Sequence, residues 1–243
     1  DDQCQPRPLP AAIELKRVRA GHAERTMVVV EHRTLVPGKC VALVGRSGSG
    51  KTTLMRTLAG LYAPIEWQGS IAWREFARCT GLVSQHPFFF NDTLRANLAY
   101  GLDQMPADSR MREVLKQVEL NALIGELPDG LDHIVAPFGT NFSGGQIQRL
   151  CLARLLLTGK NIWLLDEAKS ALDPKLDDDL TQFVIAQCRS LGILLIEITH
   201  RTDRLERFDE VWFIENGVIA ARGPHRELLS IPRYAQFCLA VQR

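Results

Sequence analysis

Long apolar runs are missing from the sequence: none approaches the roughly 18 residues that a membrane-spanning helix needs, and no secretory signal opens the chain. The six cysteines are scattered, and no two of them form a C-x-x-C pair. This spacing argues against a zinc site or a disulfide framework and favours buried free thiols in a reducing compartment. A net charge of only +1 gives no overall attraction to nucleic acid or to an anionic membrane surface, so we expect no nucleic-acid partner.

What the sequence does have is the composition of a folded domain, with 46% hydrophobic and 23% charged residues. Its 243 residues suffice for one large α/β domain, or for a core with a smaller subdomain. The chain begins with Asp1 rather than Met, and prolines stand at the alternate positions 6, 8 and 10. We therefore expect residues 1–11 to be an extended linker and the chain to be a piece of a longer protein.

Apolar runs of strand length alternate with helical patterns along most of the chain. This alternation predicts an α/β fold whose largely parallel sheet is covered on both faces. Strands are expected over residues 13–18, 26–35, 40–44, 70–73, 79–84, 162–165 and 193–196, and Asn216-Gly217 predicts a type I′ hairpin of 211–214 with 218–221. Helices are expected over 51–59, 109–120, 143–157, 176–189 and beyond 224, with a capped helical turn over 92–98. In the second helix, Met111, Val114, Leu115 and Val118 share one face.

One stretch carries the clearest chemistry: residues 45–52 read Gly-Arg-Ser-Gly-Ser-Gly-Lys-Thr and fit the pattern G-x-x-x-x-G-K-[ST]. An apolar run precedes it and a helical pattern follows, which is the strand–loop–helix context of a phosphate-binding loop. Backbone N–H groups can surround phosphate oxygens there, while Lys51 reaches the β- and γ-phosphates and the Thr52 hydroxyl ligates Mg²⁺. The alternative is a glycine-rich turn that only precedes a helix. We expect nine residues to contact a nucleoside triphosphate: Gly45, Arg46, Ser47, Gly48, Ser49, Gly50, Lys51, Thr52 and Thr53.

Two acids, Asp166 and Glu167, end an apolar strand pattern. Beside a phosphate loop, Asp166 would hold Mg²⁺ directly or through water, and Glu167 would polarise the attacking water. The alternative is an ordinary strand-to-loop exit, which the phosphate loop makes less attractive.

A second anion-binding feature stands at the start of the helix expected over 143–157. Ser143 is a good N-cap, and Ser-Gly-Gly at a helix N-terminus leaves backbone N–H groups open to an anion. Because one nucleotide needs only one such loop, we expect this site to serve a nucleotide held by another copy. The alternative is a capped helix after a glycine turn.

Taken together, these residues resemble the nucleotide-binding domain of ATP-binding-cassette (ABC) transporters, over about 13–229 of the chain. The family's motifs occur in the family's order: Walker A at 45–52, the Q-loop at Gln85, the signature at Ser143-Gly144-Gly145-Gln146, Walker B at 162–166, the D-loop at 170–173 and the switch histidine at His200. The resemblance implies an ABC ATPase domain over 12–243. Residues 12–85 and 158–243 would form a RecA-like P-loop NTPase core with a mainly parallel sheet and an antiparallel β-subdomain. Residues 86–157 would form a helical subdomain that carries the signature motif.

The resemblance also implies a head-to-tail dimer with two Mg-ATP, each between Walker A of one subunit and the signature of the other. Its cofactors would be ATP and Mg²⁺. Catalytic roles would then fall to Glu167, to His200 at the γ-phosphate and to Gln85, which would sense Mg²⁺ and the attacking water. Asp173 would communicate between the two sites.

Several sequence segments are similar to those of exporters, including residues 91–98 and 127–132. In such exporters this domain follows a membrane domain on the same chain. The implied partners are that membrane domain and a second ABC ATPase domain, in a homodimer or heterodimer at the cytoplasmic side of a membrane. Two alternatives stay open: a non-transport ABC ATPase, and a non-hydrolysing regulatory half of an asymmetric pair.

Four departures from the family's pattern affect these expectations. No tyrosine stands where the family stacks an aromatic ring on adenine, and His22 is the nearest candidate by position. Lys169 replaces a small polar residue near the expected dimer interface. Residues 136–139 read Ala-Pro-Phe-Gly and stand where exporters often carry a Glu-Arg pair. The stretch from Lys51 to Gln85 looks short, which predicts a trimmed β-subdomain.

Three consecutive phenylalanines, at 88–90, follow Pro87. They suit a protein core, since aromatic side chains are commonly buried. They also suit an apolar groove that receives a helix of the membrane domain. The second interpretation predicts that at least one of the three is exposed in the isolated domain.

Overall fold

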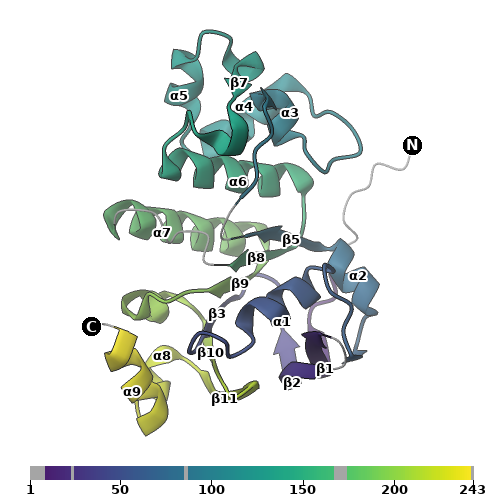
Figure 1. The fold of residues 1–243 in the computed structure, drawn as a ribbon, viewed down its shortest axis with the longest axis vertical. Helices are drawn as coiled ribbons and strands as arrows, with labels where there is room; N and C mark the ends of the chain where they lie inside the picture. The colour runs from purple at the N-terminus through teal and green to yellow at the C-terminus, as the bar shows by residue number, and fades with distance from the viewer. Residues whose placement is uncertain (1–8, 23–24, 85–86, 167–173, 242–243) are drawn as a thin grey trace. The chain divides into compact units, whose positions relative to one another are not determined.

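The structure, a computed structural model, describes residues 9–22, 25–84, 87–166 and 174–241 (Figure 1). The side chains of His22 and of residues 174–176 are not described. The described residues form two compact units. Those up to 82, 160–166 and from 178 onward make a sheet unit, and those over 83–159 and 174–177 make a helical unit.

The sheet has nine strands in the order β4-β1-β2-β11-β10-β3-β9-β8-β5. Its strands are β1 (Ile13–His22), β2 (Arg25–Leu35), β3 (Cys40–Val44), β4 (Glu66–Gly69), β5 (Thr80–Val83), β8 (Ile162–Asp166), β9 (Leu194–Ile198), β10 (Glu210–Glu215) and β11 (Val218–Gly223). The strands β10, β3, β9 and β8 pair in parallel, whereas β1 pairs antiparallel with both β2 and β4. The predicted α/β fold with a mainly parallel sheet and antiparallel strands is confirmed.

The parallel register brings the candidate chemistry to one edge of this sheet. Leu43 at the end of β3 and Asp166 at the end of β8 both pair with Ile198 at the end of β9. Segments that leave the carboxyl ends of neighbouring parallel strands emerge side by side, which is where α/β sheets bind ligands. The segments that follow β3, β8 and β9 therefore begin next to one another.

Helices cover both faces of the parallel strands, and Figure 1 shows α1 (Lys51–Leu58) and α7 (Pro174–Leu191) on opposite faces. Leu54, Met55 and Leu58 of α1 are fully buried in the core. On α7, apolar side chains three or four positions apart are buried: Leu180, Val184, Ile185 and Cys188. Because both faces are covered, β3, β8 and β9 are buried along their whole length, which explains their continuous apolar sequence.

Five cysteines are free and buried: Cys40, Cys79, Cys151, Cys188 and Cys238. Burial raises the pKa of both the Cys40 and the Cys151 thiol to about 12, so these thiols stay protonated near neutral pH. For the five, the prediction of buried free thiols is confirmed.

The strand predicted over 70–73 is wrong. Strand β4 ends at Gly69, and Trp73 instead begins the helix α2 (Trp73–Arg78). Tertiary contacts decide this: Trp73 Nε1 donates to the Thr57 carbonyl oxygen (2.8 Å), and Phe76, one helical turn on, is fully buried. The alternation of small and apolar residues suggested a strand, but the packing follows a helical spacing.

The chain after β9 contains a 3₁₀ segment, η3 (Thr202–Arg207), and the hairpin of β10 and β11. Asn216 and Gly217 both have positive φ, 52° and 75°, so the predicted type I′ turn is confirmed. The helices α8 (His225–Leu228) and α9 (Pro232–Val241) follow, as predicted for the region beyond 224.

The helical unit contains α3 (Leu94–Leu98), α4 (Asp108–Gln117), α5 (Asn121–Glu126) and α6 (Gly144–Thr158). It also has two 3₁₀ turns, η1 (Gly130–Asp132) and η2 (Pro137–Gly139), and a small antiparallel pair, β6 (Asp92–Thr93) with β7 (Ile134–Val135). The predicted apolar stripe Met111, Val114, Leu115 and Val118 is buried, as expected, and α4 packs on α6. Thr93 caps α3 by accepting from Ala96 N–H (3.1 Å), which confirms the capped turn. Helix α5 was not predicted.

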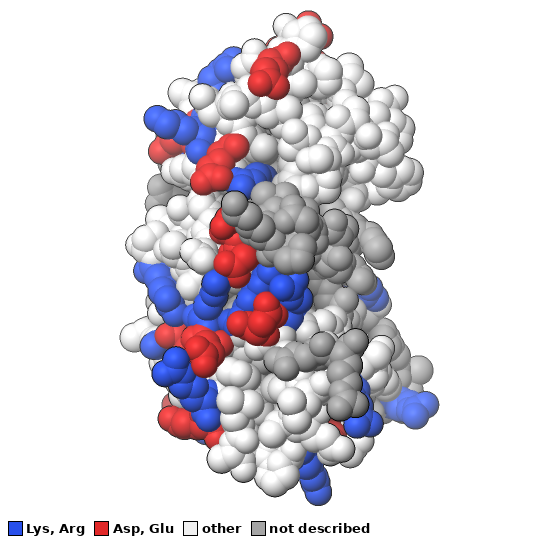
Figure 2. All heavy atoms as spheres, turned by 90° about the vertical axis from the view of Figure 1, so that its left-hand side faces the viewer, with Lys and Arg blue, Asp and Glu red and all other residues white. Residues whose placement is uncertain are grey.

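None of the described helices combines the length and the apolar character that crossing a bilayer requires. On the face drawn in Figure 2, basic and acidic side chains lie intermixed, in keeping with the small net charge.

Candidate functional site

The loop between β3 and α1 is shaped by close contact with β2. Gly50, the residue before α1, has φ of 101°, a backbone conformation that side chains disfavour. A Cβ atom there would lie 2.9 Å from both the Met27 carbonyl oxygen and the Val28 Cβ. Only glycine therefore fits this position without moving the strand.

The Lys51 ammonium lies inside this loop. Its Nζ donates to the carbonyl oxygens of Gly45 (2.8 Å) and Arg46 (2.9 Å) and to Ser49 Oγ (3.4 Å). Lys51 is only 6% exposed, so its charge is largely shielded from water. Electrostatic interactions are stronger in such a buried position than in water. Anionic oxygens are better acceptors for an ammonium than neutral carbonyls, so this arrangement suits a phosphate.

Two oxygen groups suited to a hard cation meet beside the loop. Thr52 Oγ1 donates to Asp166 Oδ1 at 3.4 Å, and Asp166 is 7% exposed at the end of β8. Hydroxyl and carboxylate oxygens are ligands that Mg²⁺ prefers. Within the described ranges, no cluster of three or more His, Cys, Asp or Glu side chains forms a metal cage. A Mg²⁺ ion here would thus take its other ligands from a nucleotide and water, as is usual for phosphate-bound Mg²⁺.

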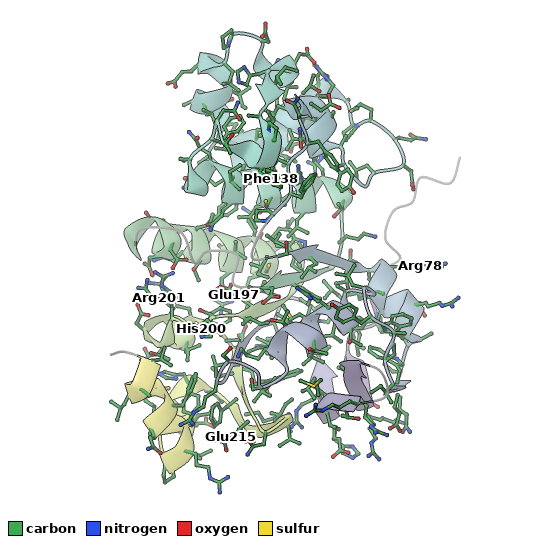
Figure 3. All side chains as sticks on the ribbon, viewed as in Figure 1. Arg78, Phe138, Glu197, His200, Arg201 and Glu215 are labelled. Atoms are coloured by element: carbon green, nitrogen blue, oxygen red, sulfur yellow. The ribbon has the colours of Figure 1, made fainter. Side chains whose placement is uncertain are left out.

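Lys51 and Thr52 line one pocket, to which His200 also contributes, and Asp166 lies next to this pocket through its contact with Thr52. His200 follows the carboxyl end of β9 (Figure 3). The lining residues are Met27, Ser47, Gly48, Gly50, Lys51, Thr52, Thr53 and His200. Six of the nine predicted loop residues are among them. The other three supply the oxygens that accept hydrogen bonds from Lys51: Gly45, Arg46 and Ser49.

Met27 is a pocket residue that sequence reasoning missed. It lies in β2, and the Val29 N–H donates to the Gly217 carbonyl oxygen (2.7 Å), which ties this strand to the β10–β11 turn. Nothing local marks a methionine in a strand as a ligand contact. The pocket position follows only from the placement of β2 beside Gly50.

In the helical unit, Ser143 is the N-cap of α6, as predicted. The Ser143 N–H donates to Gln146 Oε1 (2.8 Å), and the Gln146 N–H donates to Ser143 Oγ (3.3 Å), a complete capping box. Ser143 and Gly144 are exposed, whereas Gly145 is buried. The exposed start of this 15-residue helix carries the positive end of the helix dipole.

Four predicted site residues cannot be located in the same way. Gln85, Glu167 and Asp173 lie outside the described residues, and His22 ends β1 with its side chain undescribed. Their roles stay predictions.

The phenylalanine run divides between core and surface. Phe89 is fully buried, whereas Phe88 is 50% exposed, which confirms that at least one of the three is exposed. An exposed aromatic cluster connects Phe138, Phe88, Phe90 and Tyr100 through successive ring contacts, with centroids 5.4, 4.8 and 4.6 Å apart (Figure 3 labels Phe138). Phe138 is 67% and Tyr100 60% exposed.

Contacts of Arg154 with Phe88 and Phe89 fix the backbone that carries this exposed aromatic cluster. The Arg154 guanidinium stacks 3.8 Å from the centre of the Phe89 ring, and Arg154 Nη1 donates to the Phe88 carbonyl oxygen (2.6 Å). Phe138 has φ of 59°, an unusual conformation for a bulky residue, and its N–H donates to the Phe89 carbonyl oxygen (3.1 Å). Strained conformations of this kind concentrate at functional positions.

Comparison with known proteins identifies the family. The family model for the ABC transporter matches residues 32–170, which is more than half of the chain. The chain belongs to the ABC transporter family. Relatives of this ABC domain include an ATP-dependent lipid A-core flippase of Burkholderia pseudomallei (strain 1710b), 38% identical over 81% of the chain. Another is the mitochondrial iron-sulfur clusters transporter ATM1 of Candida albicans, 34% identical over 91% of the chain.

The ABC domain also matches a solved structure described as a bacterial Atm1-family ABC exporter with ATP bound. The TM-score is 0.83 at 28% identity, covering 97% of this chain and 43% of that one. The chain spans only 34% and 31% of the length of the two curated relatives. The predicted family and fold are thus confirmed, and membership implies ATP binding with Mg²⁺ in general.

Proposed function

We propose that this ABC domain binds and hydrolyses ATP, dimerises head-to-tail around two Mg-ATP and powers export through a membrane domain. The observation that carries the proposal is the pocket in which Lys51, Thr52 and His200 converge, with Asp166 beside Thr52. A buried ammonium beside a paired hydroxyl and carboxylate can hold phosphates and Mg²⁺ as in phosphoryl-transfer enzymes, and an imidazole can donate to a phosphate oxygen.

Each group has its own task in this proposal. Lys51 and the N–H groups of the loop bind the β- and γ-phosphates, and His200 contacts the γ-phosphate. Thr52 and Asp166 would hold Mg²⁺, with Gln85 as a further ligand. A cation held there would neutralise charge on the phosphate oxygens. Glu167 polarises the attacking water, and the Met27 thioether offers a polarisable apolar contact to the nucleoside, alongside or in place of His22.

A second copy completes the site in this proposal. The start of α6, with Ser143, Gly144, Gly145 and Gln146, would hold the γ-phosphate of the ATP bound to the other copy, while Asp173 would link the two sites. The exposure of Ser143 and Gly144 at the start of this 15-residue helix supports this role.

The membrane partner is inferred from the relatives. The flippase and the transporter are each about three times as long as the matched region, and the solved neighbour is an exporter. We infer that a membrane domain on the same chain precedes this domain and holds it at the cytoplasmic side of a membrane. The exposed aromatic cluster would be its docking surface.

Replacing Phe138 with serine should weaken docking to that membrane domain about tenfold, or 1.4 kcal/mol, because aromatic side chains are enriched among the few residues that dominate binding at an interface. The binding of ATP should not change. With the two domains expressed as separate chains, recovery of the membrane domain with the ABC domain in a pull-down measures the effect. Leu239→Ser is the matched control, since Leu239 is 64% exposed on α9. Equal loss in both variants would contradict a role of the cluster in docking.

Hydrolysis by the isolated chain should require association, which tests the proposed function directly. Without a membrane domain to hold two copies together, their effective concentration is low. The ATPase rate should therefore approach a second-order dependence on protein concentration when dilute. A specific activity that ignores dilution would contradict the shared site. Tight ATP binding without turnover would favour a regulatory, non-hydrolysing half.

A further inference from the structure

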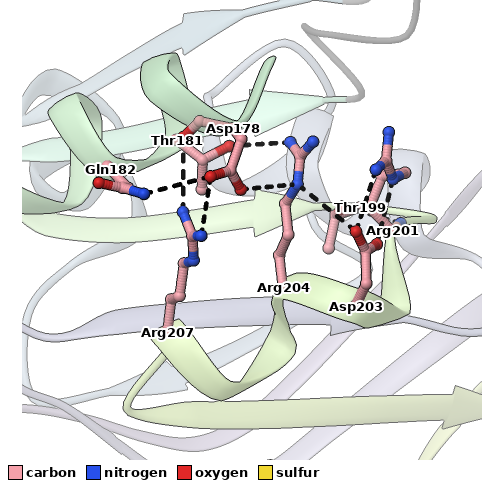
Figure 4. Close-up of polar contacts among 8 residues, drawn as sticks. All are labelled: Asp178, Thr181, Gln182, Thr199, Arg201, Asp203, Arg204 and Arg207. Atoms are coloured by element: carbon pink, nitrogen blue, oxygen red, sulfur yellow. Dashed lines mark hydrogen bonds and ion pairs between the residues drawn. The ribbon is translucent and has the colours of Figure 1, made fainter. Parts of the chain in front are cut away.

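A buried arginine stands just beyond His200. Arg204, in η3, is 4% exposed. Its Nε lies 3.4 Å from Asp178 Oδ1 on α7, and its Nη1 donates to Thr181 Oγ1 at 3.3 Å, one helical turn farther along α7 (Figure 4). The planar guanidinium therefore spans two positions of one helix face.

Asp178 collects further donors. Arg207 Nη2, from the end of η3, donates to Asp178 Oδ2 at 2.9 Å, and Gln182 Nε2 donates to the same oxygen at 3.1 Å (Figure 4). The hydrogen bond from Arg207 and the charges of Arg207 and Arg204 hold the pKa of Asp178 below its ordinary value. The carboxylate thus stays ionised between its two arginines.

A second tie holds the other end of α7. Arg189 Nη2 donates to the Arg207 carbonyl oxygen at 3.0 Å. The segment η3 therefore contacts α7 at two places: at Asp178, near the start of the helix, and at Arg189, near its end. Before η3, the Arg201 N–H donates to Thr199 Oγ1 (3.1 Å), and Arg201 pairs with Asp203, so the turn that contains His200 is also ordered.

An ion pair between a buried arginine and a carboxylate that is 32% exposed is poor evidence for stability, because partly exposed pairs contribute little and apolar side chains of similar volume often stabilise a helix contact as well or better. The best-attested use of such a pair is to fix the register between the elements that it joins, here α7 and η3. His200 lies only two residues before η3 and lines the pocket. A shift of η3 along α7 would therefore move the imidazole relative to Lys51 and Thr52.

We propose that Asp178 and Arg204 are a positioning pair that sets the place of the His200 imidazole at the γ-phosphate. The proposal rests on the proposed function, since it assigns His200 to a bound nucleotide. Neither Asp178 nor Arg204 belongs to the family motifs named above. The Asp178 carboxylate would act on the nucleotide only indirectly, through η3 and the turn after β9.

The test measures the His200 imidazole signal by NMR in the 243-residue chain, assigned by its loss in His200→Gln. A non-hydrolysable ATP analogue with Mg²⁺ should shift this signal in the wild type. Asp178→Asn should reduce the shift by at least half while the affinity for the analogue stays within about threefold. Asp179→Asn, the same change at the next and exposed position of α7, should leave the shift intact. An undiminished shift in Asp178→Asn, or equal loss in Asp179→Asn, would overturn the positioning pair.

Two further variants separate positioning from folding. Arg204→Lys keeps the charge but loses the planar fork, so it should give an intermediate shift even if Asp178→Asn does not fold. In the ATPase assay, Asp178→Asn should lower kcat in the wild-type background and have no further effect on His200→Ala. Additive losses would overturn the proposal. If the wild-type chain does not bind the analogue, the proposed function is contradicted, and this inference, which depends on it, is contradicted as well.

Discussion

Replacing Lys51 with alanine should lower the affinity for ATP about 100-fold, close to 2.7 kcal/mol. The ammonium is held by Gly45, Arg46 and Ser49 at the centre of the loop and is 6% exposed. Its hydrogen bonds to phosphate would be charge-assisted on both sides, and in a site that excludes water such bonds are the strong ones. Calorimetric titration with Mg-ATP measures the change.

Lys39→Ala is the matched control. It removes the same positive charge at the other end of β3, where Lys39 is exposed and paired with Asp209 at 3.2 Å. Its affinity for ATP should equal that of the wild type. Circular dichroism must show that Lys51→Ala folds, because Lys51 also ties the loop together. Equal ATP affinities in the folded Lys51 variant and the wild type would refute the phosphate-loop assignment.

Replacing Glu167 with glutamine should lower ATP turnover at least 100-fold, the usual order for loss of a general base. Glutamine keeps the shape and hydrogen bonding of the side chain but no longer polarises water. ATP should still bind and its γ-phosphate should still bridge two copies, so the variant should accumulate as an ATP-dependent dimer. Light scattering with and without ATP detects that dimer, and a Glu167→Gln protein that stays monomeric would contradict the shared site.

Adding Ser143→Arg to that variant should abolish the dimer. The arginine removes the capping box with Gln146 and fills the space before the N–H groups of α6. Ser109→Arg makes the same change at an exposed position on α4 and should leave the dimer intact. If both arginine variants dimerise alike, the start of α6 has no part in holding ATP.

Local signals were sufficient for several parts of this protein. The strand before residue 45, the helix after residue 50, the N-cap at Ser143 and the Asn216-Gly217 turn depend on residues near one another in the chain, and they form as expected. The motif order determined the family in the same way. Where a backbone geometry or a cap is set within a few residues, the sequence alone suffices.

Other features were decided only by tertiary structure, because they depend on partners far along the chain. Trp73 begins a helix since its indole reaches the Thr57 carbonyl oxygen, and Met27 reaches the pocket since β2 lies against Gly50. The pairing of Asp178 with Arg204 joins two segments whose sequences give no sign of each other. Residue types and spacing determine which chemistry is available, whereas long-range packing determines which of those groups meet.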